Sequence, residues 1–217
     1  MTMDLTETIP LLSGSLLGPL ALFALVSSIT PGPNNIMLAS SGLNFGFRRS
    51  MPHMLGVNLG FTLMILLVGA GLGAVFHSMP LLYTLLKYAG AAYLLYLAWK
   101  IATAGQIEEG ARGARPITFM QAAAFQWVNP KAWVMVVGLA ATYIPESGFF
   151  LNLIVAALVC AVVNLPSIGV WVTFGTALRR VLRQPAAVRA FNVGMAALLV
   201  ISLYPIALEL AAHFAPR

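Results

Sequence analysis

Long apolar stretches alternate with short polar segments along this chain. Each apolar stretch is close to the 20 or so residues that an α-helix needs to cross the hydrocarbon core of a bilayer. The pattern predicts an all-α integral membrane protein with six transmembrane helices, at about residues 16–38, 54–76, 81–101, 117–143, 149–175 and 190–212. These helices are expected to form one transmembrane domain over residues 1–217, with repeat halves at about 1–102 and 117–217 and a linker at about 103–116.

Two of the predicted spans are interrupted by proline and polar residues. The first is broken at residues 30–34 (Thr-Pro-Gly-Pro-Asn) and the fourth at residues 129–131 (Asn-Pro-Lys). Proline removes a backbone N–H group and clashes with the preceding helical turn. The carbonyl groups that lose their partners are tolerated at membrane depth only inside protein or beside a wet cavity. Each break is therefore a candidate binding site for a polar solute.

The two breaks fall at corresponding places in the two halves of the chain. Residues 33–34 correspond to residues 129–130, and the Val-Asn-Leu-Gly sequence around Asn58 corresponds to the Val-Asn-Leu-Pro sequence around Asn164. Three spans in each half predict two inverted three-helix repeats, with Pro-broken first and fourth helices that meet near the bilayer midplane. Pro33 and Pro130 are then expected to lie close together and to face a cavity between the halves.

The predicted substrate-binding site consists of both breaks and one asparagine from each following span. Its residues are Thr30, Pro31, Gly32, Pro33, Asn34, Asn58, Asn129, Pro130, Lys131 and Asn164. Amides and freed backbone groups suit a zwitterionic or polar solute, and a cation inside a membrane suits a substrate carboxylate. Two alternatives remain open: the asparagines only repair the broken backbone, and the lysine snorkels toward an interface.

Composition and charge agree with a membrane protein and predict its orientation. Hydrophobic residues make up 60% of the chain and charged residues 8%, with a net charge of +6. Nine basic residues in the loops or at the ends of spans fall on one side of the six-span arrangement, which the positive-inside rule makes cytoplasmic: Arg48, Arg49, Lys100, Arg112, Arg115, Arg179, Arg180, Arg183 and Arg189. We therefore expect a multi-pass protein of the cell inner (plasma) membrane with both termini outside, and no nucleic-acid partner.

The sequence offers no pattern for an enzyme, a metal or a cofactor. The single cysteine, Cys160, has apolar neighbours and is expected to face lipid or the core. The three histidines fall on different sides of the membrane, and neither an HExxH motif nor a nucleophile elbow is present. No carboxylate is placed as a buried proton relay. His53, at the cytoplasmic mouth of the second span, is interpreted as a passive interfacial residue.

Several motifs resemble the lysine exporter (LysE/RhtB) family of amino-acid exporters. The resemblance covers most of the chain and includes residues 30–34 (Thr-Pro-Gly-Pro-Asn), 46–49 (Gly-Phe-Arg-Arg), 56–60, 85–94 and 127–132 (Trp-Val-Asn-Pro-Lys-Ala). It implies an inner-membrane exporter of amino acids or related metabolites that is energised by the membrane potential or the proton gradient. Many family members have Asp where this chain has Asn34, a difference that bears on coupling and on any preference for cationic amino acids.

The leading hypothesis is a secondary transporter that exports amino acids or closely related small metabolites from the cytoplasm. The alternative is a non-transporting membrane scaffold or assembly factor. Polar residues at matching depths in both halves favour transport, because a scaffold needs none. The expected partners are a small-molecule substrate and membrane lipid, and the sequence is compatible with a homodimer.

Overall fold

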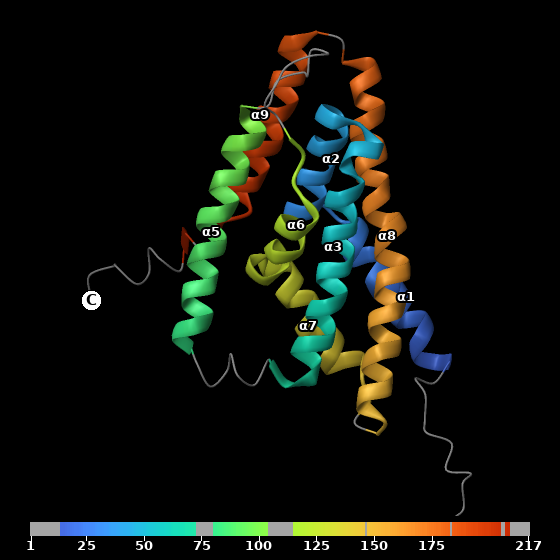
Figure 1. Cartoon of the computed structure of the whole chain (residues 1–217). Helices are drawn as coiled ribbons and strands as arrows, with labels where there is room; N and C mark the ends of the chain where they lie inside the picture. Colours follow the sequence, from blue (N-terminus) through green and yellow to red (C-terminus); the bar gives the residue numbers. More distant parts are fainter. Residues whose placement is uncertain are drawn as a thin grey trace, which may run out of the picture.

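The computed structural model describes residues 14–72, 80–103, 115–145, 147–182, 184–204 and 207–208 (Figure 1). Within these ranges the chain is helical and has no strand, which confirms the predicted all-α class. The helices are α1 (Gly14–Ile29), α2 (Pro33–Phe45), α3 (Phe47–Leu67), the π-helical turn η1 (Val68–Leu72), α5 (Pro80–Ala102), α6 (Phe119–Phe125), the 3-10 turn η2 (Gln126–Val128), α7 (Pro130–Tyr143), α8 (Phe149–Val181) and α9 (Pro185–Ile201).

The first predicted span consists of two helices joined at an angle. The axes of α1 and α2 differ by 56°, and Pro33 is the first residue of α2, a position where its missing N–H group costs no hydrogen bond. The predicted spans leave a connection between residues 38 and 54, where the structure instead has helix. α2 continues to Phe45, and Gly46 alone, with a φ of 77°, separates it from α3. The polar residues near the end of α2 indicated a loop because the sequence could not reveal that they are buried.

The second predicted break has a similar form in the other half. α6 begins with a capping box in which Thr118 and Gln121 satisfy each other's backbone N–H groups. One 3-10 turn follows α6, and α7 then starts at Pro130 with Asn129 as its N-cap. The chain is therefore interrupted just before a proline in both halves, as the motifs predicted.

The described residues contain two helices that are long and apolar enough to cross a membrane by themselves. They are Phe47–Gly71, which combines α3 with part of η1, and Phe149–Val181, which is α8. The bent pair of α1 and α2 passes the same test when it is taken as one span. Ala91–Ala102 and Pro185–Ile201 are shorter apolar helices. A membrane protein is thus supported, whereas the six-span arrangement remains a prediction.

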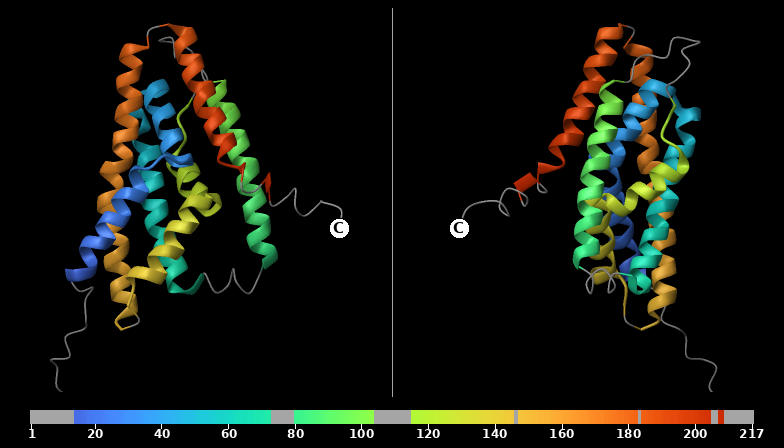
Figure 2. Two further views of the ribbon diagram at one scale, coloured as in Figure 1. Left: turned by 180° about the vertical axis from the view of Figure 1, so that it is seen from behind. Right: turned by 60° about the vertical axis from the view of Figure 1, so that its left-hand side comes forward.

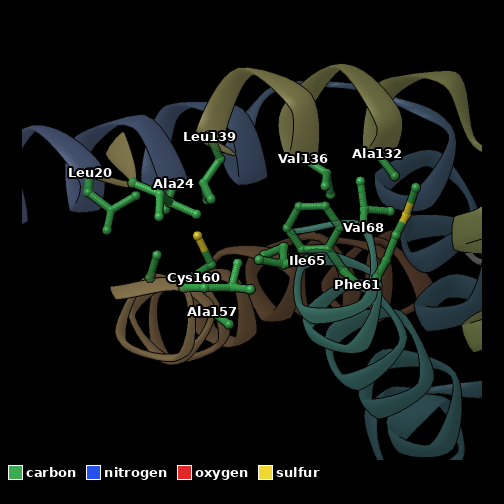
Figure 3. Close-up of a cluster of buried hydrophobic side chains, with 14 residues drawn as sticks. Leu20, Ala24, Phe61, Ile65, Val68, Ala132, Val136, Leu139, Ala157 and Cys160 are labelled. Atoms are coloured by element: carbon green, nitrogen blue, oxygen red, sulfur yellow. The ribbon is translucent and has the colours of Figure 1, made fainter. Parts of the chain in front are cut away.

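α8 is the central packing element, and it contacts α1, α2 and α3, while α5 packs beside α9 (Figures 1 and 2). The largest apolar core joins α1, α3, α7 and α8 through residues such as Leu20, Phe61, Val136 and Cys160 (Figure 3). Cys160 is a free, buried thiol, in agreement with the expected core position. This core holds the two broken segments next to each other.

Small residues allow the helices around the breaks to approach closely. A side chain added at Gly42 or Gly175 would collide with backbone atoms across the contact between α2 and α8. Gly56 and Gly60, four residues apart, place α3 in the same way against α6. Each broken segment is therefore packed against an unbroken helix of the other half.

Apart from Lys87, which lies in the first half of α5, the described basic residues outside the broken segments gather at one end of the molecule. They lie at the start of α3, at the end of α5 and α8, and near the start of α9, and these helix ends are together at the top of Figure 1. We refer to this as the basic end. Its composition agrees with the predicted grouping of Lys and Arg on one side.

Candidate functional site

Lys131 connects the two broken segments. Its ammonium group donates to the carbonyl oxygen of Thr30 at 2.8 Å, to the Thr30 hydroxyl at 2.9 Å and, at 3.4 Å, to the carbonyl oxygen of Pro31. These carbonyl groups belong to the break between α1 and α2. The lysine is directed at the other half of the protein, so it does not extend toward an interface as a snorkelling side chain would.

Asn34 makes the corresponding contact in the opposite direction. Its amide donates to Gln126 Oε1 at 2.8 Å, and Gln126 Nε2 donates back to Asn34 Oδ1 at 3.2 Å. Asn34 directly follows Pro33, just as Lys131 directly follows Pro130. In each half, the residue after the proline therefore reaches the break of the other half. This crossed arrangement brings together the two motifs that the sequence had placed at corresponding positions.

Asn58 and Asn164 form a third polar contact close by. Asn164 Nδ2 donates to Asn58 Oδ1 at 2.8 Å, and both residues are buried. The contact joins α3 to α8 through the two asparagines that the sequence paired as counterparts. A direct bond between counterparts is expected where a pseudo-two-fold axis passes between them.

A small polar cavity lies among these contacts. It has a volume of about 30 Å³, enough for a water molecule or two. Five of the predicted residues line it, namely Gly32, Asn34, Asn129, Lys131 and Asn164. Ser28 also lines it, and its buried hydroxyl has no hydrogen-bond partner. An unsatisfied buried hydroxyl costs roughly 1–3 kcal/mol unless water or a ligand pairs with it.

The remaining predicted residues lie around the cavity rather than in its wall. Thr30 and Pro31 accept from Lys131, and Asn58 supports Asn164. Pro33 is buried, Pro130 is exposed, and neither lines the cavity. The expectation that both prolines face the cavity is therefore wrong. They shape the breaks through their missing N–H groups, and the residues beside them supply the polar atoms.

Part of the polar cluster repairs the broken backbone. Asn35 Nδ2 donates to the carbonyl oxygens of Ser28 and Thr30 at 2.7 and 2.8 Å. Asn129 Oδ1 accepts from the backbone N–H of Lys131 at 3.1 Å. The repair interpretation therefore describes Asn129 and Asn35 well, but it does not account for Asn34, whose amide is paired with a side chain of the other half.

Two residues of the site, Asn35 and Gln126, were absent from the predicted set. Asn35 adjoins Asn34 and is buried, and Gln126 is fully buried at the second break. A glutamine beside a helix break is itself an indication of a polar contact, because a buried amide must find hydrogen-bond partners. Both residues lie directly beside the polar motifs, at residues 30–34 and 127–132, but the sequence did not indicate which amides face each other.

Two broken helices that enclose a polar cavity inside an apolar bundle are typical of a membrane transporter for small polar solutes. The chain belongs to the LysE type translocator family, whose model matches residues 25–211. This result confirms the family resemblance and supports an amino-acid exporter.

Curated relatives agree with the family assignment. The cysteine/O-acetylserine efflux protein of Escherichia coli (strain K12) is 36% identical over 182 residues, which cover 82% of this chain and 90% of the relative. The protein of the same name from Shigella flexneri has the same identity and coverage. That of Escherichia coli O139:H28 is 35% identical with the same coverage. No solved structure matches the chain.

Proposed function

We propose that this protein is a secondary transporter that exports small zwitterionic amino acids, of the size of cysteine and O-acetylserine, across the inner membrane. The substrate class is supported by the names of the relatives. The observation that carries the proposal is the crossed contact of Lys131 and Asn34 between the two broken segments. It places a cation and an amide pair at a cavity with an unsatisfied hydroxyl.

The charges around the cavity match the two ends of a zwitterion. A substrate carboxylate binds near the Lys131 ammonium and the N-termini of α2 and α7, where the helix dipoles favour negative charge. The substrate ammonium binds near the C-terminal end of α1, whose Thr30 and Pro31 carbonyl oxygens then lose their contact with Lys131. Substrate thus exchanges one set of polar contacts for another, so the site is not left unsatisfied.

The transport cycle we propose uses a six-span inverted repeat with both breaks near the midplane. The contact of Asn58 with Asn164 and the crossed contacts of Asn34 and Lys131 support this symmetry. A cavity of about 30 Å³ does not hold an amino acid, so this conformation is closed around the site. Entry of substrate requires the Asn34–Gln126 pair to separate, and exit requires the halves to move apart on the other side.

The basic end of the molecule is proposed to face the cytoplasm, with both termini outside. The gathering of arginines and lysines at this end supports the orientation through the positive-inside rule. Export then proceeds from the basic end to the opposite end. A homodimer also remains a prediction.

For the driving force we propose the proton gradient or the membrane potential, with His53 as the candidate proton carrier. His53 is fully buried on α3, and neither ring nitrogen has a hydrogen-bond partner. α2 and α6, which pack against α3, contain no charged residue, and the charged residues of α8 are Arg179 and Arg180 in its last turn. A proton on His53 would therefore have to arrive through water or substrate rather than from a carboxylate of these helices, and the side chain is buried rather than interfacial as we expected.

The direct test is to measure amino acids on both sides of the membrane. Cells that lack their own exporters and express this protein should accumulate O-acetylserine and cysteine in the medium faster than cells with an empty vector. Inverted membrane vesicles should take up labelled O-acetylserine when energised. Unchanged metabolite levels together with normal protein abundance would favour the scaffold alternative.

A further inference from the structure

A second and much larger cavity lies at the basic end, outside the site described above. It has a volume of about 520 Å³ and is lined by α2, by the last turns of α5 and by residues 115–118 with the start of α6. We refer to it as the chamber. Its volume is within the range of small-molecule sites, which is roughly 300–1,000 Å³.

The wall of the chamber combines apolar side chains with polar groups, and its charges have one sign. Its described lining includes Ser41, Asn44 and Gln121, with Lys100 and Arg115 as the charged residues and no Asp or Glu. Ser40 also lines it, and this serine is buried to 2% exposure while its hydroxyl has no hydrogen-bond partner. A cavity of this size with polar groups in its wall is expected to hold water. The Ser40 hydroxyl is buried in this wall as a donor without a partner.

The chamber is aligned with the central site along one face of α2. Asn34, Met37, Ser41 and Asn44 are spaced by three, four and three residues, so they lie on one side of the helix. Asn34 lines the central cavity, and the other three line the chamber. α2 therefore forms a continuous wall from the basic end to the Asn34–Gln126 pair.

The inner end of the chamber is closed by apolar side chains. Met37 and Leu97 line the chamber, and both pack with Phe125 in one buried cluster. Phe125 directly precedes Gln126 at the second break. A movement of α6 and η2 that separates Gln126 from Asn34 would therefore also shift the cluster that closes the chamber.

We propose that the chamber is a vestibule in which a small solute with a carboxylate group collects before it reaches the central cavity, with Lys100 and Arg115 attracting the carboxylate. The vestibule rests on the proposed function, because it supplies substrate to that site. A soluble occupant is favoured over an anionic lipid headgroup by the Ser40 hydroxyl of the inner wall, which has no hydrogen-bond partner. A headgroup held by the two cations at the rim would leave this hydroxyl unpaired.

The test uses cysteine modification in inverted vesicles and does not require transport. In a Cys160→Ser background, Ser40→Cys probes the inner wall of the chamber and Thr103→Cys its rim. Anionic and cationic methanethiosulfonate reagents of similar size are compared. Ser40→Cys should react severalfold faster with the anionic reagent, and the double change Lys100→Gln with Arg115→Gln should abolish this preference. Millimolar O-acetylserine should slow the modification in vesicles made of neutral lipid.

Three outcomes would overturn the proposal. They are an unreactive Ser40→Cys beside a reactive Thr103→Cys, equal rates for the two reagents, and protection that depends on anionic lipid but not on O-acetylserine. A chamber that binds the anionic reagent in a protein that exports no amino acid would contradict the proposed function alone. The two ideas can therefore fail separately.

Discussion

The Lys131 ammonium lies 2.8 Å from the carbonyl oxygen of Thr30, although 101 positions separate the two residues in the sequence. Thr30 lies at the end of α1, where a proline-broken helix leaves carbonyl groups without helical partners. The lysine supplies that partner from the other half of the protein. The Lys131 ammonium thereby pairs with carbonyl oxygens of the first break and holds the second break beside it.

Lys131→Gln should strongly reduce efflux of O-acetylserine from preloaded cells. Glutamine still reaches toward the break, but it lacks the positive charge that pairs with a carboxylate. Lys131→Arg keeps the charge and should reduce efflux less, although its planar group fits the three oxygens differently. Membrane abundance, measured by immunoblot, serves as the control. A loss of efflux that follows a loss of abundance would instead indicate structural repair.

Gly32→Ala should impair transport without changing any charge. A Cβ atom at Gly32 would lie 2.8 Å from Cδ of Lys131, so the lysine side chain must move away from Thr30. The backbone of Gly32 is extended, with a φ of −177°, and tolerates alanine. Gly138→Ala is the matched control because its Cβ meets nothing within 4 Å. Equal efflux rates for the two variants would argue against a functional position for the ammonium.

The Asn34–Gln126 pair should show coupling in a double-mutant cycle. Asn34→Ala removes the partner of the buried Gln126 Oε1, and Gln126→Ala removes the partner of the half-buried Asn34 amide, at a cost of about 1 kcal/mol each. The double variant should therefore lose less stability than the sum of the single variants, as measured by thermal unfolding in detergent. The comparison of efflux rates adds a functional readout. Additive stability losses would mean that the two amides do not interact in the folded protein.

Replacement of His53 separates a coupling role from a packing role. If His53 only fills space, His53→Leu should preserve or raise stability and leave efflux intact, because it removes two unpaired polar atoms. If His53 carries the proton, the same variant should lose efflux driven by a pH gradient. It should nevertheless keep substrate exchange in de-energised vesicles. Retained gradient-driven efflux would exclude His53 as the carrier.

The orientation can be tested with two exposed positions at opposite ends of α8. In a Cys160→Ser background, Ala186→Cys lies at the basic end and Ser147→Cys lies between α7 and α8. A membrane-impermeant thiol reagent added to intact cells should label Ser147→Cys and spare Ala186→Cys. Inverted vesicles should give the opposite result. External labelling of Ala186→Cys would reverse the proposed topology.

Local chemistry explains why much of the fold was predictable. Apolar runs of membrane length require helices, because bilayers satisfy no exposed backbone group. Pro33 and Pro130 fix the start of α2 and α7, since proline fits the first turn and breaks what precedes it. The helical class and both interruptions follow from these rules. The end of α2 could not be predicted from these rules, because Ser41 and Asn44 are polar yet buried.

The sequence by itself determined which residues interrupt the helices, because proline and glycine act on the backbone wherever they occur. It also singled out Asn34 and Lys131. Only the tertiary structure decided that Asn34 faces Gln126, that Lys131 faces Thr30, and that Asn129 serves its own helix as a cap. An amide or an ammonium takes whichever partner the packing of distant segments brings within about 3 Å. That proximity depends on how α3 and α8 hold the two halves together, and local sequence does not encode it.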